Sequence, residues 1–374
     1  MTRMERGCNM NVRRTHIGFC IAILVLLANT ASWTDEGRIE EVVVHSAALE
    51  GNLLGDSADR GVAVYLPPGY DEEPTRLYPV VYNLAGFGGV HDAEAEWYAP
   101  ELSAHMSAGT IRPMIVVFID GTNHLGGSNY ANSSVAGGWE DFVAVELVEY
   151  IDAQYRTIPA ASSRGLSGYS MGAGGAMTLA IKHADTFSAV YSTKAFMKLP
   201  HGHYTAQWKT LIKLVGWDAS VDNAMVGTGL VYPFTVAWTP NPDNGTPFVD
   251  LPYELVDGEL QPVEPTYSRL AAAFPVGVLR EYADSAARLR GIAFIAGTSD
   301  LPGLLASSRA MSQALSEAGI DHQFEEVNGD HSPLFPEQWC GRAMQFLSDT
   351  LADEAVPSAV GSRSWGAVKN EAGE

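Results

Sequence analysis

The sequence contains little cysteine, which excludes a fold held together by disulfides. Of three cysteines among 374 residues, Cys8 and Cys20 lie in the first 32 residues and only Cys340 lies beyond them. One remaining thiol cannot form an intramolecular disulfide. We therefore expect a hydrophobic core to stabilise the protein, with Cys340 packed as an apolar residue.

Basic residues are scarce relative to acidic ones. The chain has 23 Lys and Arg against 44 Asp and Glu, which gives a net charge of −21. Such a surface repels nucleic acids and anionic membranes, so we expect neither as a partner. The sequence has no dinucleotide fingerprint and no phosphate loop, so no cofactor is expected. It also shows no internal repeat. His201 and His203 form half a metal site without a third ligand nearby, so no metal is expected either.

Apolar runs long enough to span a membrane are absent, and the longest apolar run lies near the N-terminus. The 12 apolar residues 17–28 follow several arginines, and small residues at 30–32 offer cleavage points. This run is shorter than the roughly 20 residues of a membrane span. We expect residues 1–32 to be a cleaved secretory leader, with Met10 as an alternative start and an uncleaved anchor as the alternative role. The protein is then secreted or periplasmic, without a stable membrane span.

The most informative motif reads G-x-S-x-G and spans residues 168–172, between an extended run and a helix of small residues. In this context it predicts a nucleophile elbow, a sharp turn that lifts a serine hydroxyl clear of its neighbours. The positions two before and two after the serine must lack bulk. Ser170 is therefore the expected nucleophile, with Gly168 and Gly172 as elbow glycines. Ser167 is the rival, but its window lacks the second glycine.

Segments typical of strands and helices alternate along the chain. This alternation predicts an α/β fold with a mainly parallel central sheet and helices on both faces. We expect residues 33–352 to form one catalytic domain, residues 195–281 within it to form a lid-like insertion rich in aromatics, and residues 353–374 to form a disordered tail. The expected strands are 42–44, 62–66, 79–84, 114–119, 164–166, 187–192, 292–296 and 323–327, and the expected helices include 139–151, 307–318 and 336–351.

A serine nucleophile needs a base, and the base needs a carboxylate to orient it. His331 follows the last strand, and Asp300 follows the strand before it, which gives the chain order Ser, Asp, His. Asp330 is the rival carboxylate, but a direct sequence neighbour rarely reaches the ring of His331. Asp284 and Asp321 are lesser alternatives.

The oxyanion of a tetrahedral intermediate needs two backbone donors. The amide of Met171, which follows the nucleophile, is one expected donor. The other is expected from the glycine-rich loop at 86–89 that follows a buried strand. We assign it to Phe87, with Gly88 as the alternative.

Several motifs together resemble the esterase branch of the α/β-hydrolase superfamily. That branch includes S-formylglutathione hydrolases, feruloyl and acetylxylan esterases, and mycolyltransferases. The matching motifs are YLPPGY at 65–70, PVVYNLAGFGG at 79–89, DG at 120–121, WEDF at 139–142, R-x-x-x-GYSMGAGG at 164–175, GTSD at 297–300 and GDHS at 329–332. The resemblance covers about residues 40–350, is poor over the insertion, and implies the α/β-hydrolase fold and the site roles given above. One difference is Ala85-Gly86, where the family usually has a His-Gly whose histidine supports the oxyanion loop.

The sequence thus predicts an exported serine hydrolase that cleaves carboxylic esters through an acyl-enzyme. Its substrate is expected to be a small-molecule or polysaccharide-linked ester, such as a carbohydrate-linked or aryl ester. Acyl transfer to a sugar or alcohol is the alternative, since the same triad supports it. A non-catalytic binding protein on a hydrolase scaffold is a further alternative. The sequence does not indicate an oligomeric state.

Overall fold

The computed structural model describes residues 36–200, 203–214 and 227–354. The expected leader, His201 and nearly all of the expected tail lie outside these ranges. Within them, every helix is too short or too polar to cross a membrane, and Cys340 is fully buried.

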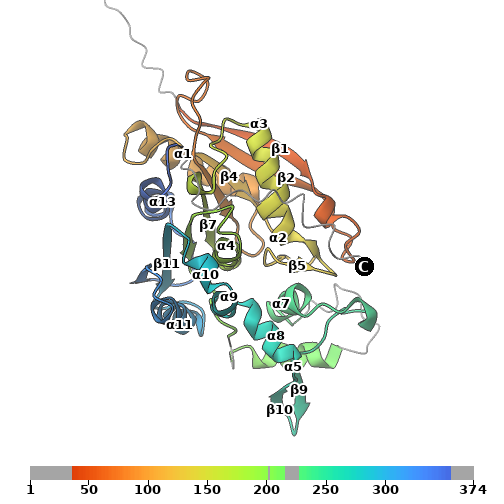
Figure 1. Ribbon diagram of the computed structural model, residues 1–374. Coiled ribbons are helices and arrows are strands. Elements are labelled where there is room, and N and C mark those ends of the chain that lie inside the picture. Colours follow the sequence, from red (N-terminus) through yellow and green to blue (C-terminus); the bar gives the residue numbers. More distant parts are fainter. Residues whose placement is uncertain (1–35, 201–202, 215–226, 355–374) are drawn as a thin grey trace, which may run out of the picture. The chain divides into compact units, whose positions relative to one another are not determined.

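A sheet of eight strands lies at the centre of the protein (Figure 1), in the order β1-β2-β4-β3-β7-β8-β11-β12. Strand β2 pairs antiparallel with both β1 and β4, and the other neighbours pair in parallel. The sheet is therefore mainly parallel, which confirms the predicted α/β fold. Its strands are β1 (Arg38–His45), β2 (Asp59–Leu66), β3 (Val80–Leu84), β4 (Ile115–Ile119), β7 (Arg164–Tyr169), β8 (Ala189–Thr193), β11 (Gly291–Gly297) and β12 (Gln323–Val327).

The central strands are continuous apolar runs because both faces of the sheet are covered. Every residue of β3 and of β4 is buried. Successive side chains of a strand point to opposite faces. In β3, Val80 and Tyr82 enter the core on one face, while Val81 enters the core on the other.

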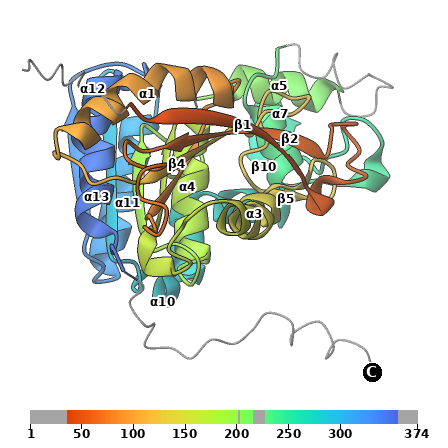
Figure 2. The ribbon, with the colours of Figure 1, turned by 90° about the horizontal axis from the view of Figure 1, so that it is seen from above.

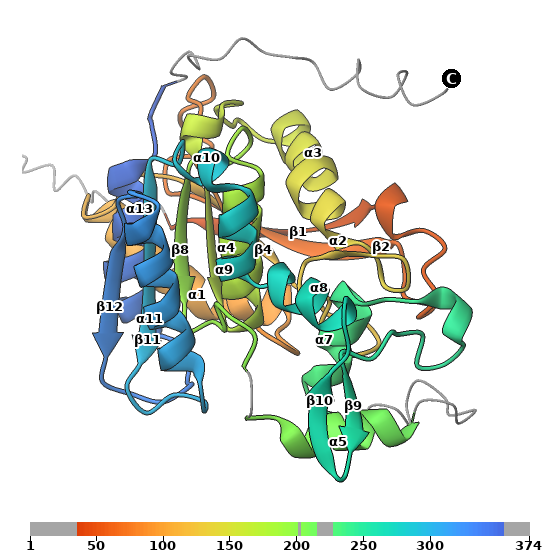
Figure 3. The same cartoon turned by 60° about the horizontal axis from the view of Figure 1, so that its bottom comes forward.

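Helices cover both faces of the sheet. Figure 2 shows α1 and α12 on one side and α3 and α4 on the other, and Figure 3 shows α4, α9, α10 and α11 in front of the strands. Two π-helical segments, Phe142–Glu146 and Cys340–Met344, continue the helices that they follow. The bounds are α1 (His91–Ser107), α2 (Trp139–Asp141), α3 (Leu147–Gln154), α4 (Met171–Lys182), α9 (Pro275–Glu281), α10 (Ala283–Ala286), α11 (Leu304–Glu317), α12 (Pro336–Trp339) and α13 (Gln345–Thr350).

Helix α1 is the one long helix of the sheet layers that the sequence did not predict. It contains Pro100, and Trp97 is exposed on its outer face. A proline and an exposed aromatic residue both obscure the apolar stripe from which a helix is recognised. The stripe is nonetheless present, because Tyr98, Leu102 and Met106 are buried against the sheet.

The described elements between β8 and α9 form a separate group below the sheet in Figure 1. Their side chains form a hydrophobic cluster of their own, which includes Trp208, Phe234 and Phe274. The cluster also takes in Leu125 and Val135, so these elements pack on the loop that follows β4. The elements are α5 (Thr205–Leu214), α7 (Val231–Trp238), β9 (Tyr253–Val256), β10 (Glu259–Pro262) and α8 (Thr266–Ala273), and the loop holds the short strands β5 (Asn132–Ser133) and β6 (Gly137–Gly138).

The turn from β7 into α4 depends on two glycines. Ser170, at the tip of the turn, has φ 54° and ψ −115°, which is a strained conformation for a residue with a side chain. A β-carbon at Gly168 would lie 2.5 Å from the carbonyl of Gly172, and one at Gly172 would lie 1.9 Å from the carbonyl oxygen of Leu84. Helix α4 can therefore begin against β3 only because both positions lack a side chain.

Substituting Gly172→Ala should destabilise the protein by about 3 kcal/mol, since backbone cannot move aside as a flexible side chain can. Gly174→Ala on the same helix is the matched control, because its β-carbon would meet only atoms 3.9–4.0 Å away. That change should be neutral or add up to about 1 kcal/mol through helix propensity. Urea unfolding of both variants measures the difference, and equal stabilities would contradict the assigned close approach.

Candidate active site

The candidate site forms where the carboxyl ends of parallel strands meet at one edge of the sheet, the usual place for ligands in an open α/β sheet. Ser170 follows β7 directly, Asp300 comes three residues after β11, and His331 comes four residues after β12. Because these strands are parallel and close in the sheet, residues far apart in the sequence are brought together.

Three of the predicted residues form a continuous chain of hydrogen bonds. Ser170 Oγ lies 2.8 Å from His331 Nε2, and His331 Nδ1 lies 2.6 Å from Asp300 Oδ1. A carboxylate can only accept, so the proton of the neutral imidazole is assigned to Nδ1. This leaves the lone pair of Nε2 to accept a proton from the hydroxyl of Ser170.

Asp300 is held in place by backbone donors as well as by the imidazole. Its side chain is fully buried, whereas that of His331 is 24% exposed. The amide of Leu301 donates to Oδ1 at 2.7 Å, and the amide of Gly297 donates to Oδ2 at 3.2 Å. In the same turn, the amide of Ser299 donates a hydrogen bond to the carbonyl of Gly329, 3.0 Å away in the loop before His331. The carboxylate is thus fixed relative to the imidazole that it contacts.

The alternative aspartates are placed differently. Asp330 accepts a hydrogen bond from the amide of Ser332 at 2.9 Å. Asp284 lies on α10, and Asp321 lies exposed before β12. Of the four aspartates considered from the sequence, Asp300 is the one that the structure brings to the imidazole.

Phe87 and Met171, the predicted oxyanion donors, both line a cavity beside Ser170. Neither of their amides donates a hydrogen bond to another described residue. The alternative donor, Gly88, gives its amide proton to the carbonyl of Gly126 at 2.9 Å. The geometry therefore favours Phe87 over Gly88 as the donor from this loop.

Tyr130 supports the same loop, and the sequence analysis did not identify it. Its buried hydroxyl lies 2.9 Å from the carbonyl oxygen of Ala85 and 3.1 Å from that of Ile119. Ala85 stands where the resemblance leads one to expect a supporting histidine. The sequence signal was a single aromatic residue within a loop rich in glycine and asparagine.

Tyr169, the second residue of the elbow motif, packs against His331. The two ring centroids are 5.4 Å apart, and the tyrosine hydroxyl donates a hydrogen bond to the backbone carbonyl of His331. Burial, together with the nearby charge of Asp300, raises the pKa of Tyr169 to about 12. The hydroxyl therefore stays protonated at neutral pH and remains a donor.

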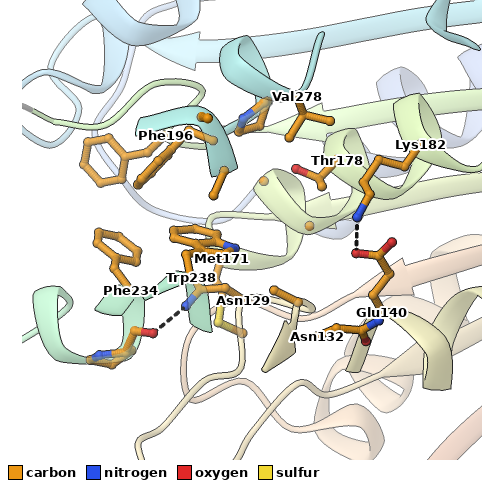
Figure 4. Close-up of a pocket in the computed structure, with 18 of the residues that line it drawn as sticks. Asn129, Asn132, Glu140, Met171, Thr178, Lys182, Phe196, Phe234, Trp238 and Val278 are labelled. Atoms are coloured by element: carbon orange, nitrogen blue, oxygen red, sulfur yellow. Dashed lines mark hydrogen bonds and ion pairs between the residues drawn. The ribbon is translucent and has the colours of Figure 1, made fainter. Parts of the chain in front are cut away.

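The cavity beside Ser170 has a volume of about 400 Å³. Figure 4 shows aromatic side chains on one side of it, among them Phe196, Phe234 and Trp238. On the other side, Lys182 Nζ forms an ion pair with a Glu140 carboxylate oxygen at 2.5 Å. The cavity therefore joins an apolar wall to a polar one next to the serine hydroxyl.

Glu140 has a second partner, His183. The ring nitrogen Nε2 of His183 lies 2.8 Å from the carboxylate oxygen of Glu140 that does not contact Lys182. Burial alone would raise the pKa of Glu140, but hydrogen bonds from His183 and Lys182 lower it. The glutamate is therefore ionised at neutral pH. Within the described residues, no group of three or more His, Cys, Asp or Glu side chains is placed to hold a metal ion.

Two features together are typical of the serine hydrolases with an α/β-hydrolase fold. One is a strained serine turn at the carboxyl end of a mainly parallel sheet. The other is a hydrogen-bond chain from that serine through a histidine to a buried aspartate. Residues 57–245, half of the chain, match the family described as "Putative esterase". The chain belongs to this family of carboxylic ester hydrolases, which confirms the family predicted from the motifs.

Similar proteins carry names consistent with this family. Two proteins of Mycobacterium tuberculosis, from strains CDC 1551 and H37Rv, are named as esterases and are each 29% identical over 285 residues. These alignments cover 72% of this chain but only 52% of the relatives, so the chain spans about half of their length.

Solved structures show the same fold at lower identity. A ferulic acid esterase is 20% identical with a TM-score of 0.60, covering 84% of this chain and 99% of that chain. An S-formylglutathione hydrolase from Agrobacterium tumefaciens is 16% identical with a TM-score of 0.56, covering 85% and 97%. Both likenesses confirm the α/β-hydrolase fold.

Glu94 lies beneath the loop that carries Phe87. Its Oε2 accepts a hydrogen bond from Asn83 Nδ2 at 3.1 Å, and a β-carbon at Gly89 would lie 3.0 Å from its Oε1. Burial and the charge of Asp120 raise the pKa of Glu94 from 4.5 to about 7. A carboxyl group with a raised pKa favours folding below its unfolded pKa, and this contribution is lost as pH rises through the folded pKa.

Glu94→Gln, which stays neutral and can still accept from Asn83, should therefore gain stability relative to the parent as pH rises. The difference in free energy of unfolding should grow by about 2 kcal/mol between about pH 5 and pH 8. Glu96→Gln, at an exposed position of the same helix, is the control and should show a nearly constant difference. Denaturant unfolding across this pH range measures both, and a flat profile for Glu94→Gln would contradict the assigned burial.

Proposed function

We propose that this protein is an exported serine carboxylesterase that works through an acyl-enzyme. The observation that carries the proposal is the hydrogen-bonded chain from Ser170 through His331 to the buried Asp300. Each link has the distance and the donor-acceptor order that nucleophilic catalysis by serine requires. The apolar run at residues 17–28 supports export.

In the proposed reaction, Ser170 Oγ attacks the carbonyl carbon of the ester while His331 Nε2 takes the hydroxyl proton. Asp300 accepts from Nδ1, which fixes the ring and stabilises the imidazolium. His331 then gives its proton to the alcohol oxygen as that bond breaks, which leaves an acyl group on Ser170. Water attacks this acyl-enzyme with the same histidine as base, which releases the acid and restores the serine.

The amides of Met171 and Phe87 would hold the oxygen that becomes negative in both tetrahedral intermediates. A preorganised donor of this kind typically contributes about 3 kcal/mol to the transition state. Both residues line the cavity, and their amides have no other partner among the described residues. Their placement supports the role given to them.

We propose esters with an aryl or extended apolar acyl group as the substrate class. The aromatic wall of Phe196, Phe234 and Trp238 stands beside the serine and suits such a group. The similar fold of a ferulic acid esterase points in the same direction. An alcohol part linked to a carbohydrate fits an exported enzyme and would extend outside this wall.

Hydrolysis of p-nitrophenyl acetate, butyrate and octanoate, together with methyl ferulate, tests the activity and the acyl preference. Ser170→Ala should lower kcat at least about a thousandfold, and Asp300→Asn should lower it by roughly 10³–10⁴. Ser167→Ala is the matched control, because the Ser167 hydroxyl is buried and accepts from Trp339 Nε1 at 3.3 Å. It should keep most of the activity.

Equal activity of Ser170→Ala and the parent would contradict the assigned nucleophile. Loss of activity in Ser167→Ala alone would move the nucleophile to that residue. Adding an alcohol or a sugar to the assay separates hydrolysis from acyl transfer, since a transferase would form a new ester at the expense of free acid. Loss of octanoate and ferulate turnover relative to acetate would contradict the proposed acyl site.

A further inference from the structure

Lys194, the residue immediately after β8, has an unusual backbone conformation. Its φ is 57°, in the left-handed region that favours glycine. Lys194 is only 5% exposed to solvent, and a lysine is rarely buried without a partner. A glycine would end the strand here without strain, so the lysine side chain itself must make an interaction that offsets these costs.

The ammonium group of Lys194 holds the loop that carries the imidazole. Nζ donates a hydrogen bond to the backbone carbonyl of Ser332 at 2.6 Å. Ser332 follows His331 directly in the sequence. A restraint on this carbonyl therefore restrains the peptide next to the imidazole.

The backbone at the end of β8 is also bonded to the other two parts of the site. The amide of Ser170 donates to the carbonyl of Thr193 at 2.9 Å, and the amide of Lys194 donates to the carbonyl of Ile295 in β11 at 2.9 Å. Strand β11 leads to Asp300. Two consecutive residues thus contact the serine turn, the strand before the aspartate and the loop of the histidine.

Titratable groups lie near Lys194 and the imidazole on three elements. Asp300 is in the turn after β11, Asp330 is in the loop after β12, and the neutral phenol of Tyr169 is on β7. Burial lowers the pKa of Lys194, while both aspartates oppose that shift. The ammonium group and the two carboxylates therefore attract one another.

We propose that Lys194 is a positioning residue for the esterase site, which anchors the His331 loop through Ser332 and offsets the charge of the two aspartates. The proposal rests on the function proposed above. Anchoring keeps Nε2 in reach of the hydroxyl of Ser170. The ammonium also balances part of the negative charge of Asp300 and Asp330.

Lys194→Gly tests the proposal without disfavouring the fold, because glycine relieves the positive φ. This variant should be at least as stable as the parent, yet kcat should fall about 10- to 100-fold with KM changed less than about threefold. Lys194→Arg keeps the cation and its donors, and should restore most of kcat.

Lys198→Gly is the control, because Lys198 is exposed four residues further along the chain. Its kcat and KM should match those of the parent. Hydrogen exchange over residues 329–334 gives a readout that does not need activity, and Lys194→Gly should accelerate it while Lys198→Gly should not. Unchanged exchange together with an unchanged kcat in Lys194→Gly would overturn the proposal. A parent without esterase activity would contradict the proposed function alone, and the exchange measurement would still decide whether Lys194 anchors the loop.

Discussion

The candidate site depends on the contact between the start of α4 and the backbone of β3. Gly172 lies so close to the carbonyl of Leu84 that any side chain there would overlap it. This contact fixes the turn that holds Ser170 in a strained conformation, with its hydroxyl directed at His331. It also sets the Met171 amide beside the loop that follows β3. The proposed nucleophile and the proposed oxyanion donors are thus positioned by one backbone contact.

The other half of the site is built by β8, β11 and β12, which come after β7 in the order of the sheet. Gly297 ends β11, and a β-carbon there would lie 2.5 Å from the carbonyl oxygen of Gly329. The turn with Asp300 and the loop with His331 therefore touch through backbone, as the serine turn and β3 do. The end of β8 bonds both halves, through Thr193 to Ser170 and through Lys194 to the histidine loop. Rigid strands and close glycine contacts give the three side chains their distances.

The sequence was most informative where local pattern and function coincide. The apolar run of β3 and the glycines around Ser170 predicted the strand and turn, because their causes lie within a few residues. Asp300 was favoured over Asp330 because a direct neighbour rarely reaches back to the imidazole. Tyr130 and Lys194 were not predicted, since their partners Ala85 and Ser332 lie 45 and 138 residues away in the sequence. Such long-range contacts leave no periodic signal.

The central claim is that His331 activates Ser170 as a nucleophile. Reaction of the purified protein with a fluorophosphonate, followed by intact mass and peptide mapping, tests it most directly. The account predicts a single adduct, located on Ser170, that forms much more slowly in His331→Ala. An adduct on another serine, or labelling of Ser170 at the same rate in the histidine variant, would contradict it.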